Sequence, residues 1–469
     1  MCMHEGGITM LDNIKRPLKY DCEFQPMYLF VLAYQKKVAT DENREIVKVL
    51  IERDNAQTAL LNLEIFSQDH EDASYNYLYV ERQIKTILWL KGGYKITYFG
   101  PKYLFNQLED DYLNKDRRFD YDFMSKVYQK PFSLTYVTSD EGFSEIEHRV
   151  ELSKNLDGNR IGFDLGGSDM KISCVQNGTS IFSEEIVWHP KTNENPDYHY
   201  EMIRKALRMA KEKMPQIDAI GISSAGIFVD NEVRVASLFL KVPEAVYQEK
   251  ITPIYKILTK ELADVPMVVA NDGDVTALAG SMSLGVNSLL GIAMGTSEAA
   301  GYIDHSGKIT GWLNELAFVP MDINPKAMID EWSNDIGCGV KYLSQDGVIK
   351  LAESAGIDLS MYNAPAEKLK HIQNMHQKGN EVAENIFETV GSYLGYAILY
   401  YSLFYDIKHV LILGRVTSGI GGHILLQNAL DVVKKENKAL FDTLSINLPD
   451  EKSRRVGQSI AAASLPKIK

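Results

Sequence analysis

The sequence lacks the marks of several protein classes. Only four cysteines occur among 469 residues, and none forms a Cys-x-x-Cys pair, which excludes a disulfide framework and a cysteine-rich zinc site and fits a reducing compartment. The apolar stretch 390–404 is shorter than the roughly 18–20 residues that cross a bilayer, so it predicts a buried core helix. Residues 1–7 show no basic region followed by an apolar run, so we expect no signal peptide and a cytoplasmic protein without membrane contacts.

An excess of positive charge is also missing. The formal net charge is -13, and acidic residues outnumber basic ones within residues 1–155 as well. Because binding to a phosphate backbone depends on Lys and Arg, this balance argues against a nucleic-acid partner. No helix-turn-helix pattern is recognisable in residues 1–155, which supports the same expectation.

What is present is an ordinary globular composition, with 45% hydrophobic and 24% charged residues, in a chain long enough for about two to four domains. The pattern changes near residue 155. Before it, aromatic and β-branched runs dominate, and we predict a strand-rich α+β domain at 1–155, with two strands around a Lys-Gly-Gly turn at 84–98 and a short helix at 42–53. A polar link follows at 153–159. The aromatic and β-branched runs that support this prediction are 27–34, 59–66, 75–80 and 84–99.

After residue 159 strands and helices alternate, which predicts an α/β fold. Residues 160–163 and 171–175 form an expected hairpin, and residues 199–214 carry a helical apolar stripe. Nearly every predicted strand end carries Gly, Ser, Thr or Asp, where open α/β sheets bind ligands. The other predicted strands are 219–222, 267–270, 289–294 and 409–413, with a long helix at 380–405.

Four strand-end motifs could bind or process a ligand. Asp-Leu-Gly-Gly-Ser at 164–168 offers backbone amides to an anion and a carboxylate to Mg²⁺, or it is a plain hairpin turn. Asn-Asp-Gly-Asp at 271–274 offers a general base, or a helix N-cap. Gly-Thr-Ser-Glu at 295–298 is a second phosphate cradle or an ordinary turn. The Gly-rich stretch 414–423 suits a nucleotide or is a flexible connector. No Gly-x-x-x-x-Gly-Lys-Ser/Thr string occurs, so a P-loop enzyme is excluded.

The order of these motifs resembles the ROK family (repressors, open reading frames and kinases) of the actin-like ATPase superfamily, from about Arg160 to the C-terminus. The resemblance implies a two-lobed actin-like ATPase (ribonuclease H-like) α/β fold preceded by the α+β domain. It implies a small lobe at 156–275 and a large lobe at 276–469, whose C-terminal helix at 455–465 returns to the small lobe. It also implies a homodimer.

The resemblance further implies an ATP-dependent kinase that phosphorylates a hydroxyl of a sugar or sugar-like metabolite, with ATP and Mg²⁺ as cofactors. Asp272 matches the catalytic base, and Asp164 would hold the metal. The implied sugar-binding residues are Asn271, Glu315, Ser224 and Gly226. The implied nucleotide-binding residues are Asp164, Gly166, Gly167, Ser168, Lys171, Gly295, Thr296, Ser297 and Gly414.

Three positions depart from the pattern of the family. Phe318 stands where a His is usual, and only Cys338 follows nearby, so we expect no structural zinc. Glu298 places a carboxylate in the Gly-Thr loop, where it would repel a phosphate unless Mg²⁺ or Lys171 compensates. Alternatively, its side chain turns outward to solvent. Arg415 replaces a second glycine. These changes leave open an alternative function, a catalytically weak sugar- or nucleotide-binding sensor. For residues 1–155 an interaction role, a dimerisation role and a wall of the substrate pocket all remain open.

Overall fold

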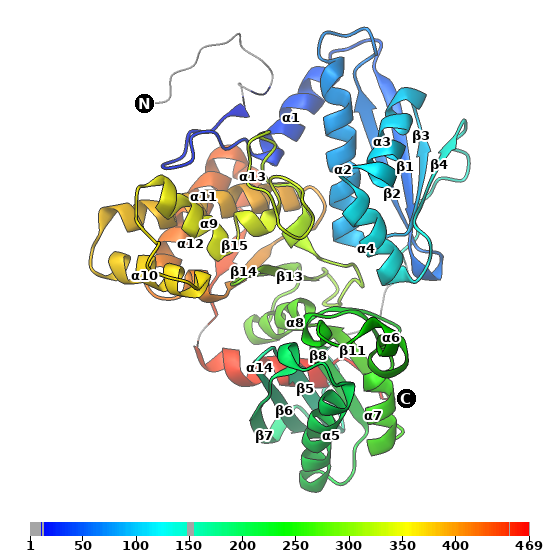
Figure 1. Ribbon diagram of the computed structural model, residues 1–469, viewed down its shortest axis with the longest axis vertical. Helices are drawn as coiled ribbons and strands as arrows, with labels where there is room; N and C mark the ends of the chain where they lie inside the picture. The colour runs from blue at the N-terminus through cyan, green and yellow to red at the C-terminus, as the bar shows by residue number, and fades with distance from the viewer. Residues whose placement is uncertain (1–10, 12–13, 148–153, 450, 469) are drawn as a thin grey trace.

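The computed structural model describes residues 11, 14–147, 154–449 and 451–468. These form one five-stranded and two four-stranded sheets, besides a two-stranded one, each large sheet in its own part of the molecule (Figure 1). We call residues 14–147 the N-terminal domain, the five-stranded sheet with its helices the small lobe, and the last four-stranded sheet with its helices the large lobe. The start of the chain at 1–7, and Ser153 of the expected link, lie outside the described residues.

The N-terminal domain is a mixed sheet with helices. Its strand order is β2-β1-β3-β4, in which only β3 and β4 run parallel. Helix α2 lies between this sheet and the large lobe (Figure 1). The elements are α1 (Met27–Val38), β1 (Glu45–Glu52), β2 (Thr58–Ile65), α2 (Asn76–Lys91), β3 (Lys95–Phe99), α3 (Lys102–Asn114), α4 (Arg118–Tyr128) and β4 (Ser133–Val137).

The strand-rich prediction for this domain is wrong in detail. Residues 84–90 belong to helix α2, residues 27–34 and 76–80 are helical, and the helix expected at 42–53 is strand β1. Every side chain from residue 79 to 90 is buried, because the sheet covers one side of α2 and the large lobe the other. A helix buried all round carries no amphipathic stripe, so its β-branched and aromatic residues resemble a buried strand.

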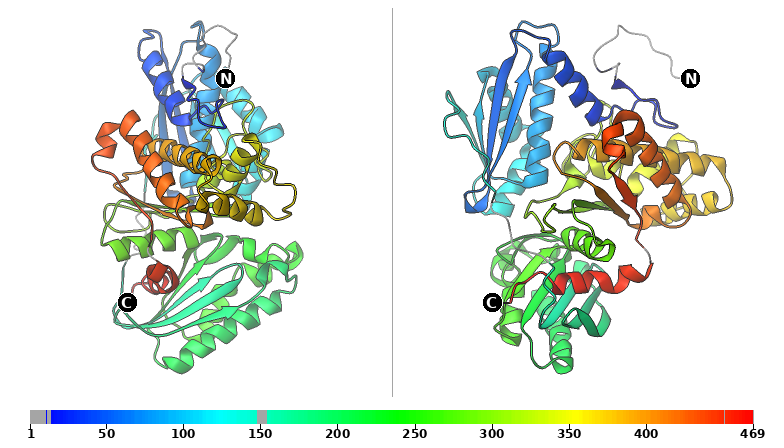
Figure 2. Two further views of the ribbon diagram at one scale, coloured as in Figure 1. Left: turned by 90° about the vertical axis from the view of Figure 1, so that its left-hand side faces the viewer. Right: turned by 180° about the vertical axis from the view of Figure 1, so that it is seen from behind.

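The small lobe is a sheet of order β11-β8-β5-β6-β7, in which β5, β8 and β11 are parallel. The expected hairpin at its centre is confirmed, since β5 and β6 pair antiparallel. Helices α5 and α14 cover opposite faces of the sheet (Figure 2). The elements are β5 (Asn159–Leu165), β6 (Asp169–Gln176), β7 (Thr179–Val187), α5 (Pro196–Lys213), β8 (Ala219–Ser224), β9 (Ile227–Val229), β10 (Glu232–Val235), α6 (Glu244–Val246), α7 (Ile254–Leu262), β11 (Met267–Asn271) and α14 (Glu451–Ala463).

Two glycines let α14 approach this sheet closely. A Cβ on Gly162 or Gly221 would lie 1.7 Å from the carbonyl oxygen of Ser459 or Ala462, respectively. Only glycine allows such an approach of backbone to backbone. The last helix of the chain is therefore held against β5 and β8, the strands that end at the candidate site.

The large lobe has the strand order β13-β12-β14-β15. Helix α11 is buried along most of its length, which confirms the prediction of a core helix at 390–404. The elements are α8 (Asp272–Leu284), β12 (Leu289–Met294), β13 (Glu298–Ile303), α9 (Gln345–Ser354), α10 (Pro365–Gln377), α11 (Glu381–Tyr401), β14 (His409–Leu413), α12 (Gly421–Glu436), α13 (Lys438–Phe441) and β15 (Ser445–Asn447).

A buried ionic cluster joins the N-terminal domain to the large lobe. Asp335 of the large lobe lies 2.7 Å from Arg82, 2.7 Å from Lys85 and 2.6 Å from Arg117, and all four side chains are buried. Burial alone would raise the pKa of Asp335, but these three cations outweigh it and hold that pKa well below its usual range. The ion pairs make the two parts one packed unit.

Polar contacts between the N-terminal domain and the small lobe are exposed by comparison. Lys126 of α4 lies 3.6 Å from Glu244, and Gln129 donates a hydrogen bond of 3.3 Å to Gln248.

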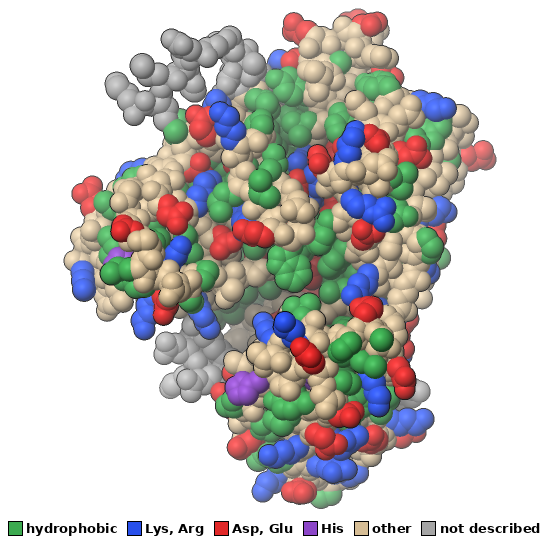
Figure 3. Space-filling model, in the orientation of Figure 1, with side chains coloured by type: hydrophobic (Ala, Val, Ile, Leu, Met, Phe, Trp, Pro, Cys, Tyr) green, Lys and Arg blue, Asp and Glu red, His purple; other side chains and the backbone are tan. Residues whose placement is uncertain are grey.

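Over the face drawn in Figure 3, basic and acidic side chains are intermixed. None of the helices formed by the described residues has the length and apolar character needed to cross a membrane.

Candidate active site

Asp164, Ser223 and Asp272 lie close together at the carboxyl ends of β5, β8 and β11. Ser223 donates a hydrogen bond of 2.9 Å to Asp164 Oδ1. Gln458 of α14 donates to Ser223 Oγ at 3.2 Å and to the carbonyl oxygen of Asp272 at 3.3 Å. Burial, and then the charge of Asp272, raise the pKa of Asp164 to about 6. A cation at Asp164 would relieve this unfavourable burial of charge.

The first glycine turn joins β5 to β6, and Gly167 and Ser168 are exposed in it. Gly166 donates its N–H to the carbonyl oxygen of Asp169 at 2.9 Å, so the hairpin-turn interpretation of this motif is correct as local structure. Lys171 pairs in register with Asp164 across the hairpin. An exposed hairpin turn can still present amides to an anion, so the two interpretations do not exclude each other.

Lys191 is a residue that the sequence analysis missed. Its side chain lies against the glycine turn, since a Cβ on Gly167 would be 2.8 Å from Lys191 Cε. Burial raises the pKa of Asp272, and the positive charge of Lys191 opposes this effect in part. Trp188 Nε1 fixes this segment by donating to the carbonyl oxygen of Gly166 at 2.8 Å. No motif signals Lys191, because packing rather than spacing brings it to the turn.

Asn271 and Asp272 lie where β11 ends and α8 begins. Asn271 caps the helix by accepting a hydrogen bond of 2.7 Å from Gly273 N–H, and its amide donates to the carbonyl oxygen of Gly226 at 2.8 Å. Asp272 Oδ1 also accepts from Gly273 N–H, at 3.0 Å. The N-cap interpretation is therefore correct for Asn271. Oδ2 of Asp272 accepts no hydrogen bond from any described residue, so it is available to a substrate hydroxyl.

Glu315 belongs to the same group of carboxylates. Burial, followed by the charges of Asp272 and Asp274, raises the pKa of Glu315 to about 7. Burial raises the pKa of Asp274 to about 7, although Asn314 donates a hydrogen bond of 2.8 Å to it. Carboxylates grouped in this way accept hydrogen bonds from hydroxyl groups, as a polyol ligand requires.

The N-terminal domain holds the segment that carries Glu315. The backbone N–H groups of Asn314 and Glu315 donate to the carbonyl oxygens of Leu90 and Trp89, at 2.9 and 3.1 Å, at the end of α2. Phe318 packs against Trp89 with ring centroids 4.2 Å apart. Phe318, which stands where the family usually has a His, is therefore part of the interface between α2 and the large lobe.

The second glycine loop and Gly414 are neighbours in the large lobe. Thr296 and Ser297 are exposed after β12, and Gly295 donates its N–H to the carbonyl oxygen of Ser297 at 3.0 Å. A Cβ on Gly414, at φ +96°, would lie 2.2 Å from the carbonyl oxygen of Met294. The close approach requires glycine at 414, and it brings the loops after β12 and β14 together.

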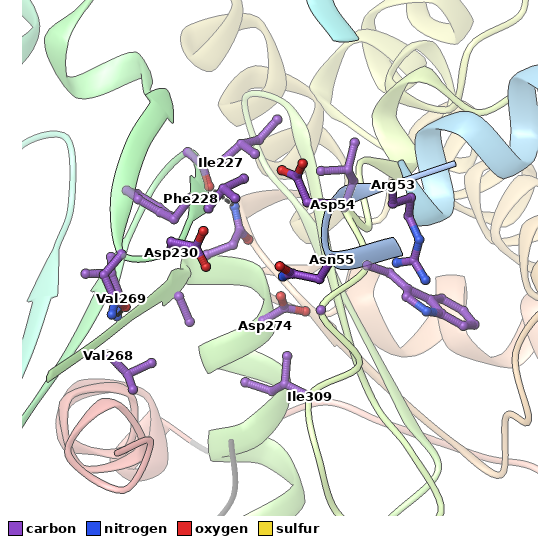
Figure 4. A pocket seen from close by; sticks show the side chains of 18 of the residues that line it. Arg53, Asp54, Asn55, Ile227, Phe228, Asp230, Val268, Val269, Asp274 and Ile309 are labelled. Carbon is purple, nitrogen blue, oxygen red and sulfur yellow. Dashed lines mark hydrogen bonds between the residues drawn. The ribbon is translucent and has the colours of Figure 1, made fainter. Parts of the chain in front are cut away.

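Two cavities lie at these strand ends. The first, of about 350 Å³, is lined by Asn271, Asp274 and Gly226, and by residues of the N-terminal domain (Figure 4). The second, of about 880 Å³, is lined by Gly414, Arg415 and apolar side chains of α8, β14 and α14. Ser224 is fully buried with its hydroxyl 2.8 Å from that of Tyr255, so the structure does not bring this predicted side chain into either cavity.

The expectation that the side chain of Glu298 turns outward to solvent is wrong. Its side chain is buried, Tyr401 donates a hydrogen bond of 3.3 Å to Oε1, and Oε2 has no partner among the described residues. Burial raises its pKa to about 8. The carboxyl group is therefore protonated at pH 7, and the repulsion of a phosphate that its charge would cause is absent.

Glu298→Gln should change how stability depends on pH. In the wild-type protein, folding keeps Glu298 protonated while the unfolded chain ionises it near 4.5. The free energy of unfolding should thus fall as pH rises from 4.5 to about 8. Each unit of pKa shift is about 1.4 kcal/mol, so urea denaturation at pH 5 and pH 9 should show the variant losing less stability. Glu212→Gln, on the exposed face of α5, is the control, and parallel curves for Glu298→Gln and the wild type would contradict the burial argument.

Residues 160–459 match the family model of the ROK family. The chain belongs to the ROK family. The ROK hexokinase from Thermus thermophilus is similar in structure, with a TM-score of 0.51 and 18% identity over 65% of this chain and 96% of that chain. A ROK family transcriptional regulator described as a homologue of the E. coli MLC protein has a TM-score of 0.51 and 15% identity, over 66% and 79%. Comparison with curated protein sequences gave no match.

At these identities the similarity shows a shared fold. The two-lobed actin-like ATPase fold predicted for the ROK part is confirmed, and so is an α+β region before it. Structural relatives of the ROK part include both a sugar kinase and a regulator. The fold therefore does not decide between these activities, and the site residues have to.

Proposed function

We propose that this ROK protein is an ATP-dependent kinase that transfers the γ-phosphoryl group to a hydroxyl of a sugar or sugar-like metabolite. The observation that carries the proposal is the position of Asp272. It is a half-buried carboxylate that directly follows β11, and its second oxygen accepts no hydrogen bond from any described residue. The cation of Lys191 and the half-buried carboxyl group of Glu315 lie near it. A kinase of this type needs a carboxylate base next to a phosphate cradle.

In the proposed reaction Asp272 accepts the proton of the substrate hydroxyl while that oxygen forms a bond to the γ-phosphorus. The bond from phosphorus to the bridging oxygen breaks, and ADP leaves. Asn271 and Glu315 orient the sugar. Amides of 166–168 and 295–297, with Lys171 and Lys191, stabilise the charge on the phosphoryl oxygens, and Gly414 allows the adenosine to approach β14.

Asp164 is the residue proposed to hold Mg²⁺. Its partial exposure at the end of β5 and its raised pKa suit a carboxylate that binds a cation, and Mg²⁺ usually takes one or two carboxylates together with substrate phosphates. When bound, the ion neutralises phosphate charge. The second cavity, with apolar walls from Leu411, Leu413 and Ile460, has the lining that a purine ring requires.

The alternative is a sugar or nucleotide sensor without turnover. Two departures favour it, the lack of the usual zinc-loop residues at and after Phe318, and Arg415, which is exposed at the rim of the second cavity. Glu298 no longer favours it, because this side chain is protonated at neutral pH. A sensor would bind the same ligands through the same cavities. Only turnover separates the two functions.

Measurement of ADP release tests the proposal. Purified protein with Mg-ATP is assayed against hexoses, N-acetylhexosamines, pentoses and polyols, with calorimetry on the same panel. We expect saturable ADP release that depends on one class of sugar, well above the rate without sugar. Binding of a sugar and of ATP without any ADP release would reject the kinase in favour of the sensor.

A further inference from the structure

The tip of the β1–β2 hairpin, residues 53–57, is a tight and well-supported turn. Arg53 N–H donates to the carbonyl oxygen of Gln57 at 2.8 Å, and Gln57 N–H donates to that of Asp54 at 3.3 Å. Asn55 and Ala56 have φ values of 59° and 56°, as a type I′ turn requires, and asparagine is among the residues that accept this conformation best. Lys130 fixes the turn by donating to Asp54 Oδ1 at 2.7 Å.

This tip lines the first cavity, opposite the strand ends of the small lobe. Arg53, Asp54, Asn55 and Gln57 line it together with Asn271 and Asp274. In Figure 4 the hairpin enters from the side of the N-terminal domain, and the side chain of Asn55 points into the cavity. A domain that lies outside the ROK match thus forms one wall of the cavity that Asn271 also lines.

Polar atoms of the tip are available to a ligand. The side chain of Asn55 is exposed and has no hydrogen-bond partner among the described residues. Arg53 is 2% exposed, and its Nη atoms donate to the carbonyl oxygen of Lys91 and to Glu147, but its Nε has no partner within the described chain. A buried donor without a partner is costly unless a ligand or water satisfies it.

The size and charge of the cavity restrict its ligand. Its volume of about 350 Å³ is near the lower end of the range of ligand pockets, which begins at about 300 Å³. Asp54, Asp230 and Asp274 contribute carboxylates to the wall, while the cation of Arg53 is already paired with Glu147 at 3.0 Å. Arg53 is the one Lys or Arg that lines the cavity, so an anionic ligand would find no unpaired cation in the wall, whereas hydroxyl groups would find acceptors.

We propose that the hairpin tip is part of the acceptor site and makes it specific for neutral, hydroxyl-rich ligands of monosaccharide size. Asn55 hydrogen-bonds a ligand hydroxyl, and the turn blocks the extension of a longer glycoside. The inference deepens the proposed kinase function and rests on it. It assigns to the N-terminal domain the selection of the substrate.

Asn55→Gly is the test variant, because glycine keeps the left-handed turn and removes only the amide. Calorimetry with glucose, N-acetylglucosamine, ribose and mannitol measures binding without turnover, and glucose 6-phosphate and maltose probe charge and length. We expect the variant to bind the preferred neutral sugar about five- to ten-fold more weakly, as the loss of one hydrogen bond gives. Its affinity for ATP and its kcat should stay close to wild type while its KM for the sugar rises. Asn334→Gly removes another exposed asparagine with positive φ and should leave sugar binding unchanged.

Each outcome decides between the two proposals. Unchanged sugar affinity in Asn55→Gly overturns the role of the hairpin and leaves the kinase standing. Tighter binding of glucose 6-phosphate or maltose than of every neutral monosaccharide or polyol, or no binding of any of these, overturns the inferred specificity. Weaker sugar binding in the variant, with no ADP release from either protein, supports the hairpin and rejects the kinase.

Discussion

Asp272→Asn should reduce sugar-dependent ADP release by about 10²–10⁴-fold, the usual contribution of a positioned general base. The amide keeps the acceptor oxygen that bonds Gly273 N–H, so the turn into α8 should survive. It cannot take the proton of the substrate hydroxyl. Steady-state kinetics should place the loss in kcat, and calorimetry should show ATP binding within a few-fold of wild type.

Asp230→Asn provides the matched control for this variant. Asp230 is an exposed carboxylate on the wall of the first cavity, and its loss should change KM for the sugar more than kcat. Near-normal turnover in Asp272→Asn would remove Asp272 as the base. The kinase proposal would then need another carboxylate of the same group, of which Glu315 is the first to test.

Asp335→Ala should destabilise the protein by about 3–5 kcal/mol, because it leaves buried cations without their shared partner. The carboxylate lies within 2.7 Å of Arg82, Lys85 and Arg117. Urea denaturation followed by tryptophan fluorescence should detect the change, since Trp89 packs beside this interface. Asp335→Asn, which keeps the shape, should also be destabilised because it loses the charge.

The control for this second variant is Asp122→Ala. Asp122 pairs with Arg118 on an exposed face of the N-terminal domain, where screening by water leaves an ion pair little net effect, so no measurable change is expected. Equal stability of Asp335→Ala and the wild type would mean that apolar packing alone holds the N-terminal domain to the large lobe.

The fold of the ROK part was predictable because its strands are short, apolar and followed by characteristic loops. The strands at 289–294 and 409–413 have the predicted bounds. The N-terminal domain was not predictable in the same way. Helix α2 is buried on all sides, and its sequence therefore lacks the periodicity that distinguishes a helix from a strand.

The residues of the candidate site likewise include some that the sequence indicates and others that only the structure reveals. The sequence indicated Asp164, Asn271 and Asp272 because these residues come directly after predicted strands, and the structure brings them to one edge of the sheet. Lys191 and Asn55 carry no such signal, since only tertiary packing places them at the site. For Glu298 the sequence showed a charge, while the burial that makes it neutral depends on Gly339 and Tyr401, distant in the chain.

The ionic cluster has a consequence for the order in which the chain is made. Arg117 and Asp335 are 218 residues apart, and synthesis at about 5–20 residues per second separates their appearance by roughly 10–40 s. During this interval α2 has been made, but the surface that covers its second side has not. The N-terminal domain therefore completes the packing of α2 only after synthesis has passed Asp335 in the large lobe.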